Sequence, residues 1–235
     1  MPREARAPQS EHRGVFAAPF PVFLDVQGKR VLVVGGGHVA ARKVAALLRA
    51  GALVTVVAPS AVTEIAEDPD VRWHERVYRR GEVASYSLAI TATDDSSVNR
   101  QVARDANAAN VWVNSADDPA NCSFILPSVV TRGDLQIAAS TNGRSPAMAQ
   151  WVRRRLEDLF TDVHATALDL LAEVRSDVRA TNGTSEIAGW SEVIDDDFFA
   201  LVAAGELDAA RRYLQAGLKH DDGVAGQDGG LGAVS

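Results

Sequence analysis

Cysteine is nearly absent from this sequence, since Cys122 is the only one among its 235 residues. An intramolecular disulfide is therefore excluded, as is a metal site built on paired Cys-x-x-Cys ligands. We expect Cys122 to be a buried small side chain rather than a nucleophile. The five histidines are scattered without ligand spacing, so no resident metal is expected. This composition fits a reducing cytoplasm.

Long apolar runs are missing as well. No stretch approaches the roughly 18 to 20 apolar residues of a membrane span, and residues 1–14 are polar, unlike a signal peptide. A basic excess is also lacking, because 24 Lys and Arg against 31 Asp and Glu give a formal net charge of −7. Proteins that bind nucleic acid regardless of sequence need that excess to replace the phosphate counterions. We therefore expect a cytoplasmic protein that binds neither membranes nor nucleic acid.

Short apolar runs alternate with amphipathic segments in the first half of the chain. The pattern predicts a strand over 31–34, a helix from Val39 to a C-terminal cap at Gly51, and a second strand over 53–57. Two strands joined by such a helix form the right-handed βαβ unit of a parallel sheet. Further strands are expected over 71–77, 88–92 and 111–114, with a helix over 96–110 opened by a Ser cap. The expected fold class is a doubly wound α/β domain.

The pattern changes after Asp118 and Pro119. Short strands are expected over 124–126, 129–130 and 135–139, and the Gly133-Asp134 pair predicts a hairpin between the last two. Ser145 and Pro146 then predict the start of a helix that continues to Phe160, and the chain beyond it is expected to be helical.

A glycine-rich turn follows the first predicted strand. The run Gly35-Gly36-Gly37-His38-Val39-Ala40 satisfies G-x-G-x-x-A between a strand and a helix. In such a turn Gly35 permits the tight bend, Gly37 lets the backbone approach a pyrophosphate, and Ala40 allows close packing of helix on strand. The alternative is a tight turn that needs small residues for packing only. The second strand ends in Ala58, Pro59 and Ser60 without the usual ribose-binding acid, so these residues leave the choice between NAD and NADP open.

Polar residues follow two later strands, in the runs 93–95 and 114–118. In open α/β sheets ligands bind outside the carboxyl ends of the strands, so both runs are candidates for a site. Asp94, Asp95 and Asp118 are at least as well explained as helix caps and turn residues. Asp117 is the strongest candidate for a catalytic carboxylate.

The order of these motifs resembles the precorrin-2 dehydrogenases, the amino-terminal module of siroheme synthases. The resemblance covers about 20–160. It rests on the following residues: Pro21-Val22-Phe23-Leu24; Val33 to Gly37 with Val39-Ala40-x-Arg42-Lys43; Ala92 to Asp95 with Asn99; Val113-Asn114 with Asp117-Asp118-Pro119; Ser123-Phe124-Ile125 with Pro127-Ser128; and Ser140 to Gly143 with Ser145-Pro146. The chain departs from the family at Ser115 and Ala116, where two valines are common, and at Asn142, where glycine is common.

The resemblance implies NAD-dependent oxidation of precorrin-2 to sirohydrochlorin and, in bifunctional members, insertion of Fe²⁺ as a substrate to give siroheme. It also implies a Rossmann NAD-binding domain over 20–122, a strand-rich dimerisation segment over 123–155 and a small helical domain over 156–218. The composition predicts a disordered leader over 1–19, which lacks apolar periodicity, and a disordered tail over 219–235, which is rich in Gly and Asp. A homodimer is expected. The methyltransferase module of trifunctional siroheme synthases does not fit in the remaining residues, so a separate uroporphyrinogen methyltransferase is expected to supply the substrate.

The same resemblance identifies site residues. By position the family's catalytic aspartate is Asp117, a base able to serve both dehydrogenation and chelation. The residues expected to bind NAD are Gly35, Gly36, Gly37, His38, Val39, Pro59, Ser60 and Thr93. Those expected to contact the substrate are Asn114, Ser123, Arg132 and Arg144, the arginines because precorrin-2 carries eight carboxylates. Residues 1–155 hold 19 basic and 15 acidic side chains (+4) and 156–235 hold 5 and 16 (−11), so the part that resembles the catalytic module is the basic part.

Two other function classes share the glycine-rich turn. An NAD(H)-sensing regulatory module would not need the polar residues that follow the later strands, which favours an enzyme. A dehydrogenase of a small metabolite would need a longer substrate domain with its own His or Lys acid, and no candidate for that acid is evident.

Overall fold

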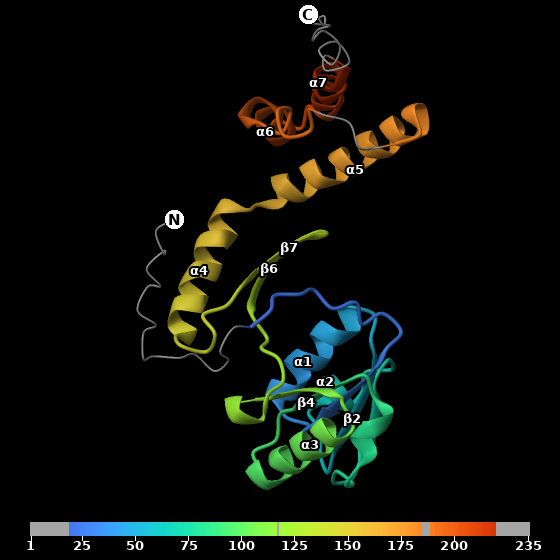
Figure 1. Ribbon diagram of the computed structural model, residues 1–235, viewed down its shortest axis with the longest axis vertical. Coiled ribbons are helices and arrows are strands. Elements are labelled where there is room, and N and C mark those ends of the chain that lie inside the picture. The colour runs from blue at the N-terminus through green and yellow to red at the C-terminus, as the bar shows by residue number, and fades with distance from the viewer. Residues whose placement is uncertain (1–18, 117, 185–188, 220–235) are drawn as a thin grey trace, which may run out of the picture. The chain divides into compact units, whose positions relative to one another are not determined.

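A computed structural model describes residues 19–116, 118–184 and 189–219 of the chain (Figure 1). Internal contacts divide it into two compact units, one made of Met1–Pro127 and Ser140–Met148, the other of Ser128–Ala139 and Ala149–Ser235. The predicted leader and tail lie outside the described residues, apart from positions 19 and 219.

A parallel five-stranded sheet forms the centre of the first unit. Its order is β3-β2-β1-β4-β5, with β1 Arg30–Val34, β2 Leu53–Ala58, β3 Arg72–Glu75, β4 Leu88–Thr91 and β5 Trp112–Ser115. Strands β2 and β3 follow on one side of β1, and β4 and β5 then follow on its other side. The carboxyl ends of β1 and β4 therefore flank the point at which a ligand binds in doubly wound folds. The predicted Rossmann-like domain is confirmed.

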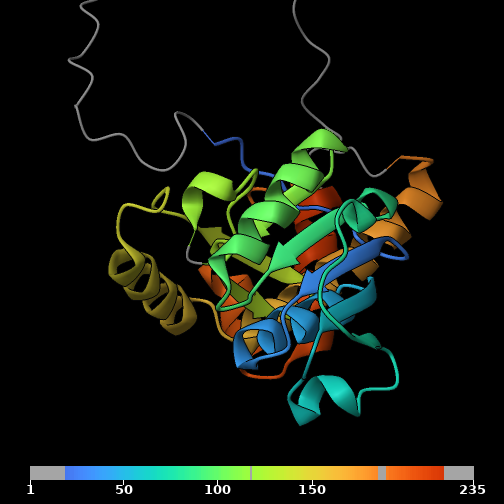
Figure 2. The same ribbon diagram turned by 90° about the horizontal axis from the view of Figure 1, so that it is seen from below.

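Helices cover both faces of this sheet (Figure 2). Val31 and Val33 point to one face, where they pack in a buried cluster with Val44 of α1 (His38–Arg49). Leu32 points to the other face and packs in a second cluster with Val102 of α3 (Ser96–Ala108). Because successive strand residues alternate between faces, the apolar run of β1 serves two cores at once. Short α2 (Thr63–Ala66) and η1 (Glu82–Ser85) complete the connections.

The helix after β4 is capped by an aspartate and not by the predicted serine. Asp95 Oδ1 accepts hydrogen bonds from the N–H groups of Ser97 (2.8 Å) and Val98 (3.3 Å). The hydroxyl and N–H of Ser97 and the N–H of Val98 hold the pKa of Asp95 below its usual value. The predicted Ser cap is wrong because Ser96 already has helical backbone, which leaves Asp95 as the residue whose side chain reaches the free N–H groups.

The second unit contains a hairpin and a helical bundle. Strands β6 (Ser128–Arg132) and β7 (Leu135–Ala139) are antiparallel, and Gly133 in their turn has a φ of 54°, so the predicted hairpin is confirmed. The bundle packs α5 (Asp162–Asn182), α6 (Asp196–Ala203) and α7 (Leu207–Lys219) around Val174, Phe198 and Leu214. Among the described residues, no helix is both long and apolar enough to span a membrane.

Helix α4 (Pro146–Leu159) passes from the first unit into the second. Ser145 Oγ accepts the N–H of Met148 at 3.1 Å, and Pro146 occupies the first helical position. The predicted start of this helix is confirmed.

The predicted strand over 124–126 is wrong, because that segment is a loop. Its neighbours 122 and 123 lie along the outer edge of β5 and bond to it mainly with side chains. Ser123 Oγ accepts the Val113 N–H (2.7 Å), and Cys122 Sγ accepts the Ser115 N–H (3.1 Å). The edge of β5 is thus occupied, and 124–126 has no partner strand with which to pair.

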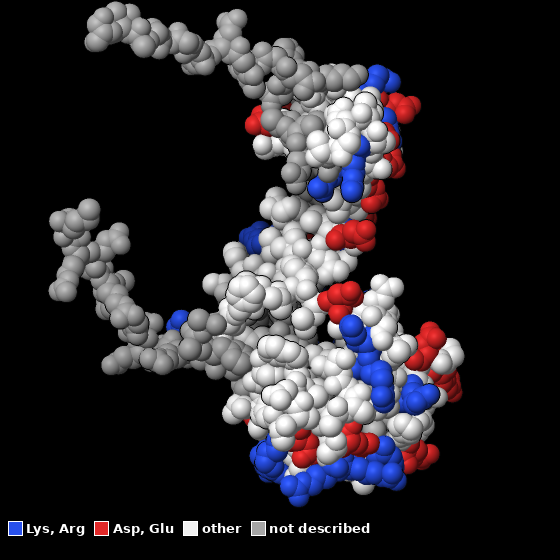
Figure 3. All heavy atoms as spheres, turned by 45° about the vertical axis from the view of Figure 1, so that its right-hand side comes forward, with Lys and Arg blue, Asp and Glu red and all other residues white. Residues whose placement is uncertain are grey.

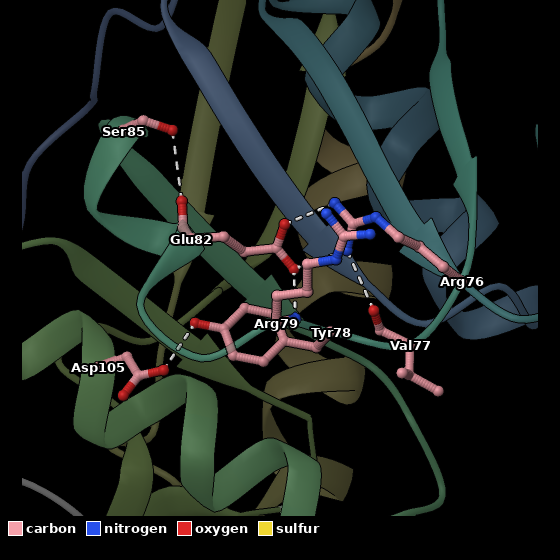
Figure 4. A network of polar contacts seen from close by, with 7 residues as sticks. All are labelled: Arg76, Val77, Tyr78, Arg79, Glu82, Ser85 and Asp105. Carbon is pink, nitrogen blue, oxygen red and sulfur yellow. Dashed lines mark hydrogen bonds and ion pairs between the residues drawn. The ribbon is translucent and has the colours of Figure 1, made fainter.

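A polar network fixes the long connection from β3 to β4 against α3 (Figure 4). Asp105 Oδ2 accepts the Tyr78 hydroxyl (3.0 Å) and the Gly81 N–H (2.7 Å), and Oδ1 accepts the Gln101 amide (2.7 Å). Burial opposes ionisation of this carboxyl, which is 9% exposed, yet the three hydrogen bonds outweigh it and lower the pKa of Asp105. The carboxylate is therefore the anchor of the loop.

We expect Asp105→Ala to lower the free energy of unfolding at pH 7 by about 2 to 3 kcal/mol, because three donors, two of them partly buried, lose a charged acceptor. The pKa of Asp105 is lower in the folded protein than in the unfolded one. Its contribution is therefore complete above the unfolded value of about 3.9 and disappears as the pH falls through the folded value. Urea denaturation at pH 7 and pH 3 measures both effects. The exposed Asp70→Ala is the control, and a difference that does not shrink at pH 3 would contradict the assignment.

Candidate functional site

The glycine-rich turn lies between two loops that leave little space for side chains. A Cβ atom on Gly35 would lie 2.2 Å from the carbonyl oxygen of Ala92, at the end of β4, and φ of Gly35 is +125°. A Cβ atom on Gly36 would lie 2.0 Å from the carbonyl oxygen of Ser60, beyond the end of β2. Packing of the protein itself therefore requires both glycines, whether or not a ligand binds.

Gly37 has a different environment. A Cβ atom there would meet no heavy atom within 4 Å, and φ of −84° with ψ of −178° is backbone that any residue adopts. Neither packing nor backbone conformation accounts for this glycine. The open space beside it is what a group that approaches the backbone closely, such as a pyrophosphate, would fill.

The start of α1 is suited to an anion. Its N-cap residue is Gly37, whose position offers no side-chain cap, and the first turn carries no acidic residue. His38 and Val39 are exposed at this end, whereas Ala40 is fully buried and lets α1 pack closely on the sheet. The exposed His38 Nδ1 lies 3.6 Å from Glu64 Oε1. Uncapped N–H groups and the positive end of the helix dipole fit the phosphates of a dinucleotide.

The end of β2 lacks a carboxylate for the ribose. Ala58 is buried, and the next two residues, Pro59 and Ser60, are exposed on the rim beside the glycine-rich turn. The predicted cofactor residues of the turn and of β2 therefore lie together at one end of the sheet. Thr93 lies on the other side of the turn. A Cβ atom on Gly35 would lie 3.1 Å from the Thr93 backbone nitrogen.

The predicted base, Asp117, lies outside the described residues. The strand before it is tightly fixed: the buried Thr91 and Ser115 hydroxyls are joined at 2.9 Å, and the Ala116 N–H donates to the Thr91 carbonyl at 2.8 Å. Beyond it, Asp118 Oδ2 accepts the Asn121 amide at 2.6 Å, which agrees with the turn role considered for Asp118.

Two predicted substrate residues use their polar atoms within the protein. The Asn114 amide donates to the Phe124 carbonyl (2.9 Å), and the Ser123 hydroxyl donates to the Val113 carbonyl (3.1 Å). Cys122 is half-buried, and burial raises the pKa of its thiol. A protonated thiol that bonds to the edge of β5 is not an activated nucleophile.

The predicted arginines lie in different units. Arg132 belongs to the second unit, where it donates to the Glu157 carbonyl (3.3 Å) and lies 3.8 Å from Asp162. Arg144 belongs to the first unit and is exposed. In the view of Figure 3, Lys and Arg side chains also form a band along the lower edge of the first unit. Within the described residues, no group of three or more His, Cys, Asp or Glu is arranged to hold a metal.

Sequence reasoning missed two features near the site. One is the buried pair of hydroxyls, Thr91 and Ser115. Ser115 departs from the family's common valine, but the hydrogen bond that it allows was not predicted. The other is the side chain of Asn99, which is buried beneath the loop after β4. Asn99 is among the residues that carry the family resemblance, but no role was predicted for it. A polar residue at a helical position that faces the core was the additional signal.

Comparisons with known proteins agree with this geometry. A family model described as "Putative NAD(P)-binding" matches residues 22–128, and a second, "Sirohaem biosynthesis protein central", matches 132–159. The siroheme synthase of Photorhabdus laumondii is 35% identical over 207 residues, 86% of this chain and 44% of that protein. The siroheme synthase of Nitrosococcus oceani is 39% identical over 204 residues, 85% and 44% respectively. The chain thus spans less than half the length of these relatives.

A solved structure is similar over most of the chain. It is that of SirC, a precorrin-2 dehydrogenase, with a TM-score of 0.68 and 26% sequence identity. The match covers 86% of this chain and 100% of that one.

Proposed function

We propose that this chain, as a member of the family that unites precorrin-2 dehydrogenase with the siroheme synthases, oxidises precorrin-2 to sirohydrochlorin with NAD as the hydride acceptor. The observation that carries the proposal is the open side of Gly37 at the uncapped start of α1. It is the one glycine of the turn for which the protein's own packing gives no reason, and a bound dinucleotide supplies one.

The reaction requires a hydride acceptor and a base. The glycine-rich turn and the start of α1 would hold NAD⁺, which would supply the hydride acceptor. With one proton released from the macrocycle, the products would be sirohydrochlorin, NADH and H⁺. We assign the base to Asp117, which comes two residues after β5 in the sequence. Strand β5 ends at the same end of the sheet as the glycine-rich turn. A carboxylate beside the ring also suits removal of pyrrole protons as a metal enters, so we extend the proposal to insertion of Fe²⁺ as a substrate.

The supply and location of the substrate follow from the same proposal. Precorrin-2 is a methylated tetrapyrrole, so a uroporphyrinogen methyltransferase must produce it. We place the reaction in the cytoplasm, with which a single half-buried thiol is compatible.

Incubation of the pure protein with precorrin-2 and NAD⁺ tests the proposed function. We expect sirohydrochlorin, followed by its absorption spectrum, to appear together with an equal amount of NADH. Addition of Fe²⁺ should then give siroheme faster than in a protein-free control. Binding of NAD without turnover would favour the NAD(H)-sensing module instead, and sirohydrochlorin without faster metallation would limit the protein to the dehydrogenase step.

We further propose that the protein is a homodimer formed through α4 and the β6–β7 hairpin. Helix α4 has no buried residue within the single chain, although it carries Met148, Trp151 and Leu159, which are 52%, 50% and 64% exposed. Val129 of β6 is 39% exposed. An amphipathic helix whose apolar side chains remain in solvent is typical of an interface.

Trp151→Glu is expected to shift the protein from dimer to monomer, because it places a charge among apolar contacts. Light scattering at micromolar concentration measures the mass. Gln150→Glu adds the same charge at a neighbouring exposed position of α4 and should remain dimeric. A wild-type protein that is monomeric under these conditions would exclude the assignment.

A further inference from the structure

Asn99 is a buried polar residue in the first turn of α3. Its side chain is 5% exposed in a region otherwise packed with apolar groups. The Asn99 amide nitrogen donates to the Thr93 carbonyl at 2.8 Å, and its amide oxygen accepts the Thr93 hydroxyl at 3.0 Å. Both polar atoms of one side chain therefore hold one residue of the loop after β4.

The helix itself does not require this asparagine. Asp95 already caps α3. On the inner face of this helix, Val102 and Ala103 are fully buried. An apolar residue at position 99 would pack without the cost of burying an amide. The use of both amide groups on Thr93 indicates that Asn99 serves the geometry of the loop.

Thr93 is in turn attached to the glycine-rich turn. The Ala92–Thr93 peptide is the surface against which Gly35 packs, since a Cβ atom on Gly35 would lie 2.2 Å from the Ala92 oxygen and 3.1 Å from the Thr93 nitrogen. The Ala92 N–H also donates to the Val34 carbonyl at 2.8 Å. A displacement of this peptide would therefore displace the turn or leave a gap beside it.

The same loop reaches the strand that precedes Asp117. Thr91 accepts the Ala116 N–H through its carbonyl and donates its hydroxyl to Ser115. The residues 91–93 thus contact the glycine-rich turn on one side and the end of β5 on the other. One short segment therefore connects the proposed NAD site with the end of β5, the strand that precedes Asp117 in the sequence.

We propose that Asn99 is a positioning residue for catalysis: by clamping Thr93, it holds the loop 91–93 so that the glycine-rich turn and the end of β5 keep their relative placement. The proposal rests on the proposed function. Asn99 lies behind the loop and acts through Thr93, so it affects both cofactor affinity and the rate at saturating cofactor.

Asn99→Asp keeps the shape of the side chain but replaces the donor to the Thr93 carbonyl with an acceptor. We expect the Kd for NAD, measured by calorimetry, to rise about tenfold, which is about 1.4 kcal/mol. We also expect kcat at saturating NAD to fall about tenfold. In the protein without NAD, amide hydrogen exchange of a peptide covering 91–95 should accelerate, a change that does not depend on turnover. The matched control is Asn107→Ala, on the exposed side of the last turn of α3.

A second variant decides the matter if Asn99→Asp folds poorly. Thr93→Val removes the hydroxyl that the Asn99 amide oxygen accepts. It should reproduce part of the effect on Kd and kcat, and it should accelerate hydrogen exchange over 91–95 in the protein without NAD. Folded Asn99→Asp and Thr93→Val proteins with Kd and kcat within twofold of wild type would overturn the proposal. If the wild-type protein binds no NAD, the proposed function fails instead, and the exchange measurement still tests the clamp.

Discussion

Gly37→Val should bind NAD at least 100-fold more weakly than the wild-type protein while remaining folded. The backbone at Gly37 is already in a conformation open to valine, and a Cβ atom there meets nothing within 4 Å, so the substitution costs the fold little. The new side chain would occupy the space through which a pyrophosphate approaches the N–H groups of α1. A 100-fold change corresponds to about 2.8 kcal/mol of binding free energy. Calorimetric titration with NAD⁺ and thermal unfolding of both proteins measure the two quantities.

Gly35→Ala is the informative comparison for that variant. It should destabilise the first unit severely, because the added Cβ would overlap the Ala92 carbonyl in backbone that L residues rarely adopt. The two substitutions therefore separate a glycine needed for folding from one needed for a ligand. If Gly37→Val bound NAD as tightly as wild type, the turn would serve packing only, and the proposed cofactor site would be wrong.

Asp117→Asn is expected to lower kcat for sirohydrochlorin formation by a factor of 10² to 10⁴, the usual contribution of a positioned acid or base. The amide keeps the size of the side chain but cannot accept the proton that leaves the macrocycle. Calorimetry should give an unchanged Kd for NAD, because we assign the cofactor to the glycine-rich turn. Stopped assays with precorrin-2 and NAD⁺ at saturation measure the rate.

Asp118→Asn is the matched control, since Asp118 is the neighbouring carboxylate and already bonds to Asn121. It should retain most of the activity. A fully active Asp117→Asn protein would remove Asp117 from the mechanism, whereas equal losses in both variants would point to the conformation of the loop rather than to a base. Loss of metallation together with dehydrogenation in Asp117→Asn would support one carboxylate for both reactions.

The elements that apolar periodicity and flanking Gly or Pro residues define were predictable from the sequence. The apolar run of β1, the glycine-rich turn and the helix that ends near Gly51 form one βαβ unit in the structure as predicted. Gly133 and the Ser145-Pro146 pair were equally informative, because each has a direct backbone consequence: a left-handed turn residue and a helix start.

The errors share a physical cause, which is that local sequence does not specify partners. The apolar residues 124–126 resemble a strand, but a strand forms only where a neighbour has free N–H and C=O groups. The available neighbour is the edge of β5, and its N–H groups already donate to the side chains of residues 122 and 123. The Ser cap failed for a related reason: Asp95 and Ser96 are both good caps, and only the backbone decides which of them precedes the first turn.

The site was predictable in outline and not in its contacts. Strand order brings the glycine-rich turn, Ser60 and Thr93 to one end of the sheet, and that order follows from the βαβ rule. The assignment of Arg132 to the substrate stays a prediction. It rested on proximity in sequence, which carries no information on contacts such as the 3.8 Å approach of Arg132 to Asp162. The interactions of Asn99 with Thr93 depend likewise on how α3 packs beneath the loop.

The side-chain bonds along β5 have a consequence for the behaviour of the protein in concentrated solution. A β-strand at the edge of a sheet is a template on which another molecule's strand can add, and natural proteins protect such edges. Here the Val113 and Ser115 N–H groups are satisfied by an oxygen and a sulfur from the following loop, and the Ser123 N–H donates to the Val113 carbonyl at 2.7 Å. The sheet is therefore closed at β5 to growth by intermolecular strand pairing. This closure depends on the side chains of a cysteine and a serine, which accept the N–H groups that a neighbouring strand would otherwise bind.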